Sequence, residues 1–209
     1  MKRISLSGVL ICVITQLLMS QDFTPPAEAI QAASENFTQF LTNAVTEETK
    51  TMVGFDAEDD LSKAVLGNPF RLFRLLADSI RNYNGIAPLR DIVNESDMWY
   101  FPIVIDEKIK MMLYVGKKDG KWMRAGLGSA GLSRQMQEIT SQWSSSAGFT
   151  PMIVQQQNVG AYFYNIPQVD NYNLTETASA LTRTGLSEST SQLKTLDAAI
   201  NDLRSRISR

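Results

Sequence analysis

The sequence predicts an α+β domain: an antiparallel sheet made of a meander plus a hairpin, helices packed on one face, and a C-terminal helix. Three observations predict this class. Residues 99–126 alternate with a period of two and contain hairpin signals, residues 132–143 carry apolar side chains at helical spacing, and residues 152–166 contain two further strand-like runs. Helices and strands in this order are typical of helices segregated to one side of an antiparallel sheet.

Residues 1–20 form a predicted signal peptide. Lys2 and Arg3 precede an apolar run from Ile4 to Met19, and Ser20 offers a small residue for cleavage. Two polar residues interrupt the run, which is shorter than the roughly 20 apolar residues that a membrane helix needs. The sequence therefore predicts export to the periplasm or the exterior, with no permanent membrane span after cleavage. An uncleaved amino-terminal anchor is the alternative.

The residues that are missing exclude several kinds of chemistry. The chain has no histidine, and its only cysteine, Cys12, lies in the predicted signal peptide. A Ser-His-Asp triad, a Cys-His pair and a thiolate zinc site are therefore excluded. Carboxylate chemistry, a Ser-Lys pair, a tyrosine acid and calcium bound by oxygens remain. We predict no catalytic residues, no cofactor and no metal.

The charge of the mature chain argues against nucleic acid as a partner. Loss of Lys2 and Arg3 leaves 18 of the 20 basic residues against 22 acidic residues, a net charge of −4. Binding to phosphates needs a basic footprint, which this chain lacks.

Residues 21–173 form the predicted domain. Its first helix follows Pro26 and carries one apolar stripe made of Ile30, Ala33, Phe37, Phe40, Leu41, Ala44 and Val45. A short helix over 61–66 ends at the stop signal of residues 66–69, and a strand over 70–76 leads to turn residues 82–85.

Acidic residues 56–60 precede that short helix. They lack the alternating ligands and central glycine of a calcium loop, so they are expected to form a solvated helix start.

The meander is expected from residues 99–125. An aromatic and β-branched strand over 99–105 is followed by a polar break and by the alternating run Ile109–Val115, which predicts a strand with one buried face. Asp119-Gly120 is a hairpin signal before a third strand over 121–125. A helix beginning near Ser129 and two strands over 152–157 and 160–166 complete the domain.

Residues 174–209 are predicted to be a Ser/Thr-rich linker followed by an amphipathic helix. Its apolar stripe comprises Leu193, Leu196, Ile200, Leu203 and Ile207. This stripe could pair with another protein or a second copy of the chain, or it could dock on its own domain.

Three short segments carry a resemblance. They are Leu66-Gly67-Asn68-Pro69-Phe70, Trp99-Tyr100-Phe101-Pro102-Ile103 and Asp119-Gly120-Lys121-Trp122. This pattern, within about Leu61 to Pro167, resembles uncharacterised exported bacterial proteins. The segments contain turn and strand residues rather than reactive groups. The resemblance therefore implies an exported bacterial α+β domain and supplies no catalytic residues.

Basic residues concentrate on the meander: Lys108, Lys110, Lys117, Lys118, Lys121 and Arg124. In an acidic protein they are candidates for docking an anionic partner or a lipid headgroup. The alternative is a solvated sheet face whose lysines protect an edge strand from aggregation, and it is favoured because charge alone gives no specificity.

A glycine-rich segment supplies a candidate anion site at Gly126, Gly128, Ser129 and Gly131, where a strand is expected to meet a helix start. A dinucleotide site would also need an acidic residue about 20 positions further on, and residues 145–157 contain none. A tight strand-to-helix turn is the favoured interpretation.

Three functions remain. The first is an exported noncatalytic domain that binds a protein or an envelope component. The second is a periplasmic small-molecule carrier or sensor with an apolar pocket between sheet and helices. The third is a carboxylate-dependent enzyme, which would need two acids facing each other across a cleft.

Overall fold

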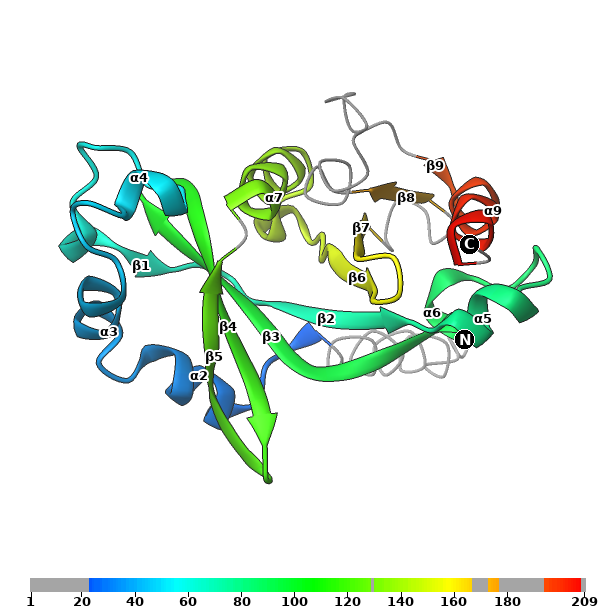
Figure 1. The fold of residues 1–209 in the computed structure, drawn as a ribbon, viewed down its shortest axis with the longest axis horizontal. Coiled ribbons are helices and arrows are strands. Elements are labelled where there is room, and N and C mark those ends of the chain that lie inside the picture. Colours follow the sequence, from blue (N-terminus) through cyan, green and yellow to red (C-terminus); the bar gives the residue numbers. More distant parts are fainter. Residues whose placement is uncertain (1–22, 129, 167–172, 177–193, 208–209) are drawn as a thin grey trace, which may run out of the picture.

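The computed structural model describes residues 23–128, 130–166, 173–176 and 194–207 (Figure 1). The predicted signal peptide and most of the predicted linker lie outside these residues. The α+β class, the mostly antiparallel sheet and the C-terminal helix are confirmed. Among the described residues, no helix combines the length and the apolar character needed to cross a membrane.

The described helices and strands follow one another from Ala27 to Ile207. The α-helices are α2 (Ala27–Ser34), α3 (Phe37–Ala44), α4 (Lys50–Val53), α5 (Ala77–Asn82), α6 (Leu89–Ile92), α7 (Ala130–Gln142) and α9 (Leu196–Ile207), with 3₁₀ turns at Leu61–Lys63 and Ser145–Ala147. The strands are β1 (Val65–Leu66), β2 (Phe70–Leu75), β3 (Val93–Ile105), β4 (Lys108–Lys118), β5 (Lys121–Gly128), β6 (Met152–Gln156), β7 (Ala161–Asn165), β8 (Asn173–Glu176) and β9 (Lys194–Thr195).

The sheet joins the predicted meander to the predicted hairpin. Its strand order is β5-β4-β3-β2-β6-β7-β8-β9, and β1 also pairs with β3. The meander β3-β4-β5 and the hairpin β6-β7 are antiparallel as expected. The connection between them is the parallel pair β2-β6, in which Leu72 lies opposite Ile153. This pairing joins residues far apart in the chain and was not predicted.

Tight turns set the register of both meander hairpins. Asp106 and Glu107 have φ values of 48° and 64°, and Asp119 and Gly120 have values of 51° and 79°. Two successive residues with positive φ form the turn that matches the twist of a two-stranded ribbon. The β4-β5 hairpin projects from the body of the molecule (Figure 1).

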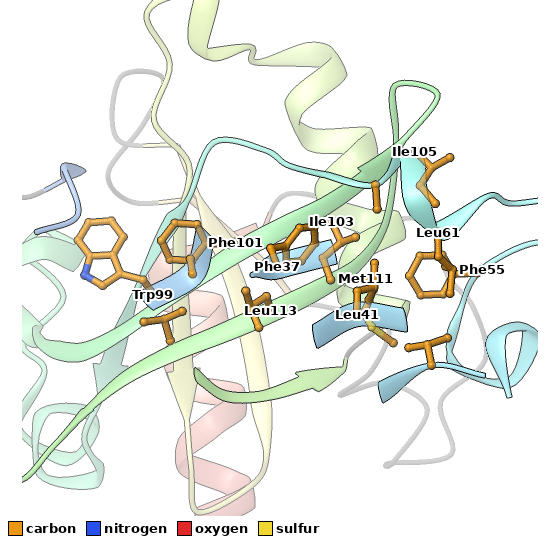
Figure 2. Close-up of a cluster of buried hydrophobic side chains, with 14 of the residues drawn as sticks. Phe37, Leu41, Phe55, Leu61, Trp99, Phe101, Ile103, Ile105, Met111 and Leu113 are labelled. Atoms are coloured by element: carbon orange, nitrogen blue, oxygen red, sulfur yellow. The ribbon is translucent and has the colours of Figure 1, made fainter. Parts of the chain in front are cut away.

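Helices cover both faces of the sheet, so the prediction of helices on one face is wrong in this detail. On one face, α2 and α3 pack on a cluster that includes Trp99, Phe101, Ile103 and Leu113 (Figure 2). On the opposite face, α7 packs on β4 within a second cluster. The consecutive residues Met111–Leu113 are therefore all buried, and the expectation of a single buried face on this strand is wrong too.

The first predicted helix is two helices. Asn36, with φ of 49°, adopts the left-handed conformation between α2 and α3 and turns the chain. Within α2 the buried face is formed by Ala29 and Ala33, and Ile30 is 46% exposed beside it. The predicted stripe therefore misplaces Ile30 on the buried face. The second predicted helix, over 61–66, is a 3₁₀ turn followed by β1, which pairs with β3.

The C-terminal helix belongs to the domain core, so the predicted boundary at residue 174 does not separate it. Leu196, Ile200 and Leu203 are buried in a third cluster with residues of β2, β6 and β7, and Ile207 packs against its edge. Arg204 donates to the carbonyl oxygens of Ile80 (2.9 Å) and Tyr83 (2.5 Å), which ties α9 to α5.

Candidate functional site

A polar cleft of about 750 Å³ lies between α2 and the tip of the β4-β5 hairpin. Three parts of the chain line it. The α2 wall contributes Glu28, Gln31, Ala32 and Glu35; the hairpin wall contributes Lys117, Gly120, Lys121 and Trp122; and strands β2 and β3 contribute Arg71, Asp97 and Trp99, with Thr24 and Pro26 at the rim. The volume lies in the range of about 300–1,000 Å³ that is usual for small-molecule sites.

The β2-β3 side of the cleft is held by interactions of Arg71. Its guanidinium pairs with Glu95 at 2.8 Å and lies 5.8 Å from the ring centroid of Trp99, which sits opposite it in the sheet register. The Trp99 ring is buried, and Arg71 is itself only partly exposed. This part of the cleft is therefore fixed before any ligand binds.

The hairpin wall combines a ring with exposed cations. The Lys117 ammonium lies 5.9 Å from the ring centroid of Trp122, its partner in the register of β4 and β5, and this distance suits a cation–π contact. Lys117 and Lys121 are exposed and Trp122 is half-buried. A half-buried indole beside charged groups offers both a stacking face and a polar edge to a ligand.

The structure divides the predicted basic patch. Lys117, Lys118 and Lys121 are exposed together at the hairpin tip, and two of them line the cleft. Lys108 is exposed at the turn at the other end of β4. The remaining two cations, Lys110 and Arg124, have partners within the fold.

Lys110 is a buried ion-pair residue rather than part of a docking surface. Its side chain is 8% exposed, and its ammonium lies 2.5 Å from Asp56 and 2.9 Å from Asp59. Burial opposes its charge, but the hydrogen bonds to both carboxylates outweigh burial and raise the pKa of Lys110. The same hydrogen bond is the main cause that lowers the pKa of Asp56. The acidic segment 56–60 therefore anchors a loop on β4.

Arg124 holds the α2-α3 corner on β5. Its guanidinium donates to the carbonyl oxygens of Ala33 (3.1 Å) and Glu35 at the end of α2, and it lies 4.6 Å from the ring centroid of Phe40 in α3. A cation at this position satisfies carbonyl groups that a helix end leaves without partners. Burial lowers the pKa of Arg124. This residue shapes the α2 wall of the cleft and does not line it.

The glycine-rich segment makes room for an aromatic ring. Gly126 lies opposite Tyr114 in the register, and a Cβ atom on Gly128 would lie 3.2 Å from the Tyr114 hydroxyl. This close approach gives a structural reason for Gly128, whereas at Gly126 the reason is its φ of 154°. Gly131 is half-buried in α7, and Ser129 lies outside the described residues, so the candidate anion site stays a prediction.

The apolar stripe of α9 faces its own domain. Leu196, Ile200 and Leu203 are buried there, Ile207 packs at the edge, and Leu193 lies outside the described residues. Of the two alternatives for this stripe, the structure shows the one in which the helix docks on its own domain.

Four tyrosines, Tyr100, Tyr114, Tyr162 and Tyr164, gather on the α7 face. The rings of Tyr100 and Tyr114 lie 4.5 Å apart, and the Tyr164 hydroxyl donates to the carbonyl oxygen of Leu132 at 2.8 Å. Burial raises the pKa of both Tyr100 and Tyr164 far above the usual value. A catalytic acid needs a pKa near the working pH, so these hydroxyls are poor candidates for that role.

A second cavity, of about 420 Å³ and mainly apolar, adjoins the α7 face. Its walls include Phe70, Pro102, Val104, Ile109 and Phe149, and residues 23–25, the lead-in before α2, close one side. The side chain of Asn68 donates to the Ser145 hydroxyl at 2.8 Å across it. The sequence suggested an apolar pocket between sheet and helices lined by methionine and aromatic side chains; among the described residues, this cavity is lined by three phenylalanines and by no methionine.

No residue set among the described parts of the chain gathers three or more acidic side chains in a position to bind a metal ion. Comparisons of the chain with protein-family models, with curated proteins and with solved structures give no match. The geometry of the two cavities is therefore the basis for assigning a function.

Proposed function

We propose that this protein is an exported, noncatalytic domain that binds a component of the cell envelope in the cleft between α2 and the β4-β5 hairpin. The observation that carries the proposal is the lining of this cleft. It combines the half-buried Trp122 ring with exposed cations of the hairpin and with exposed carboxylates on the α2 side. A ring face with charges of both signs around it suits a polar ligand that carries both charges.

The chemistry of the chain supports binding rather than catalysis. There is no histidine to act as a base, and the carboxylates that line the cleft, Glu28, Glu35 and Asp97, are all exposed. Active sites usually hold their acids and bases in shielded positions that shift the pKa toward the working pH.

Co-sedimentation tests this proposal with two envelope probes, insoluble peptidoglycan and vesicles of phosphatidylethanolamine with phosphatidylglycerol. The wild-type protein is expected to sediment with one of them. The double variant Lys117→Glu/Lys121→Glu and the single variant Trp122→Ala are expected to stay in the supernatant, because they alter the hairpin wall.

Lys118→Glu is the matched control. It makes the same charge change at the same hairpin tip, but Lys118 does not line the cleft. If all three variants still sediment, the cleft is not the binding site. The same conclusion follows if Lys118→Glu loses sedimentation to the same extent as the double variant.

A second candidate function is a small-molecule carrier, and the apolar cavity favours it. Its walls are mainly hydrocarbon, and its volume is in the range of ligand pockets. Native mass spectrometry of freshly purified protein is expected to show a retained ligand if this function is correct, and a protein mass without ligand in several preparations argues against it.

A further inference from the structure

We infer that the ligand is a zwitterionic phospholipid with one hydrocarbon chain, whose headgroup occupies the charged cleft and whose chain occupies the apolar cavity. This inference rests on the proposed function, because it names the ligand of the same cleft.

The two cavities share part of their walls. Thr24 and Arg71 line both of them. The lead-in before α2 runs from one to the other, since Phe23 and Pro25 line the apolar cavity while Pro26 lines the charged cleft. Phe23 fixes this segment by packing against Phe73, with ring centroids 6.2 Å apart. A single ligand can therefore extend from one cavity into the other past Thr24 and Arg71.

The apolar cavity suits a hydrocarbon chain. Four prolines line it, and proline has no backbone N–H that would lose hydrogen bonding to water beside an apolar ligand. Arg71, at the boundary with the cleft, is the one charged residue in its lining. The volume of about 420 Å³ is at the low end of the usual range for ligand pockets, which suits one chain rather than two.

The charged cleft suits a headgroup with both a phosphate and an amine. Lys117 and Lys121 on the hairpin wall can bind a phosphate as point charges, and Glu28 and Asp97 can accept hydrogen bonds from an ammonium group. The lining contains three cations, of which Arg71 already pairs with Glu95, and three carboxylates, so a ligand that carries both charges finds an opposite charge for each of its groups.

Arg71 separates the polar and apolar parts of the site. Its ion pair with Glu95 (2.8 Å) and its hydrogen bond to the carbonyl oxygen of Ser96 (3.4 Å) hold the guanidinium at the boundary. In this position it marks the junction between headgroup and chain.

Calorimetric titration with two probes tests the inference. The probes are a lysophosphatidylethanolamine with a dodecanoyl chain, used below its micellar concentration, and glycerophosphoethanolamine, which is the headgroup alone. The lysolipid is expected to bind at least about tenfold more tightly, because its chain transfers several methylene groups from water to an apolar cavity.

Variants in the two cavities separate the contributions. Phe149→Ala is expected to weaken binding of the lysolipid about tenfold or more and to leave binding of the headgroup alone unchanged, since it removes a wall of the apolar cavity. Lys117→Glu is expected to weaken both probes, and Lys118→Glu neither. Thr140→Phe, which fills the apolar cavity from α7, provides a second variant if Phe149→Ala does not fold.

The outcomes distinguish the inference from the proposed function. If the lysolipid binds no better than the headgroup, or if both apolar-cavity variants leave its affinity unchanged, the inference is wrong. Loss of headgroup binding in Lys117→Glu would then still support the cleft as a site for a polar ligand. If neither probe binds the wild-type protein, the inference is also wrong, and sedimentation with peptidoglycan decides on the proposed function.

Discussion

The C-terminal helix α9 and the β4-β5 hairpin both carry a side-chain pattern that is typical of an interaction surface, yet the fold uses them in opposite ways. The apolar residues of α9 complete the core beside α5, β6 and β7. The lysines at the hairpin tip remain exposed and border a cleft. The pattern of a segment alone does not decide its use, because the elements that pack around it determine what stays accessible.

The same contrast occurs within the single strand β4. Lys110 lies where the loop before β1 covers the sheet, and two carboxylates of that loop neutralise it. Lys117 lies seven positions further along, beyond that loop, and remains exposed. Two lysines on the same strand therefore have different roles, one structural and one available to a ligand.

The largest expected effect tests whether α9 is part of the core. Leu203→Ala removes a side chain that is 0% exposed in the third cluster, and it is expected to lower the free energy of unfolding by about 2–5 kcal/mol through lost burial and a cavity. Urea denaturation followed by circular dichroism measures this change.

Ile86→Ala is the matched control for that variant. Ile86 is 75% exposed, so its truncation is expected to change stability by no more than about 0.5 kcal/mol. Equal stability of Leu203→Ala and the wild type would mean that α9 is not part of the core. Its apolar stripe would then be a possible interaction surface.

A smaller effect is expected for the buried lysine of β4. Lys110→Met leaves the Asp59 carboxylate, which is itself only 9% exposed, without its cation, and it is expected to cost about 2 kcal/mol. Lys117→Met, on the exposed part of the same strand, is expected to change stability by less than about 0.5 kcal/mol. Equal midpoints of chemical denaturation for the two variants would contradict the different roles assigned to Lys110 and Lys117.

The turn at the hairpin tip is expected to matter less still. Gly120 has φ of 79°, and no atom lies within 4 Å of a Cβ built there, so Gly120→Ala meets backbone strain but no steric clash. The expected loss is about 1 kcal/mol, measured as a shift in the denaturation midpoint. A loss as large as that of Leu203→Ala would show that the tip is packed against the domain and is not a projecting surface.

The smallest effect is a pH dependence. The hydrogen bond from Lys110 lowers the folded-state pKa of Asp56 below its usual value of 3.8. The stabilisation that follows from this shift is fully present above the usual value and is lost as the pH falls through the lower folded value. The stability difference between the wild type and Asp56→Asn is therefore expected to be larger at neutral pH than well below pH 3.8. Because Asp56 is exposed, solvent screens its interaction with Lys110, and the effect is expected to be small. A stability difference between the wild type and Asp56→Asn that grows as the pH falls would contradict this assignment.

The sequence was sufficient for the elements whose pattern is local. Alternation over Ile109–Val115, the Asp119-Gly120 turn and the spacing of Leu132, Met136 and Ile139 predicted the meander and α7, because period and turn chemistry reside in neighbouring residues. The sequence did not predict the break at Asn36, because the apolar spacing continues through this residue. Only its left-handed backbone conformation interrupts the helix.

The site could not be predicted in the same way. Lys110 and Asp56 are 54 positions apart, and the cleft combines residues from 24–35, 71–99 and 117–122. These residues come together through long-range packing, which the periodicity of the sequence does not predict. The basic patch was therefore predicted as six equivalent cations, although two of them serve the fold and only two line the cleft.

The most direct test of the central contrast is a two-dimensional ¹H–¹⁵N titration of the protein with the dodecanoyl lysophosphatidylethanolamine. We expect amide signals of residues 117–122 and of residues near Phe149 to shift together and to saturate at one ligand concentration, while those of residues 196–207 stay in place. Shifts concentrated in residues 196–207, with the hairpin signals unchanged, would contradict the account.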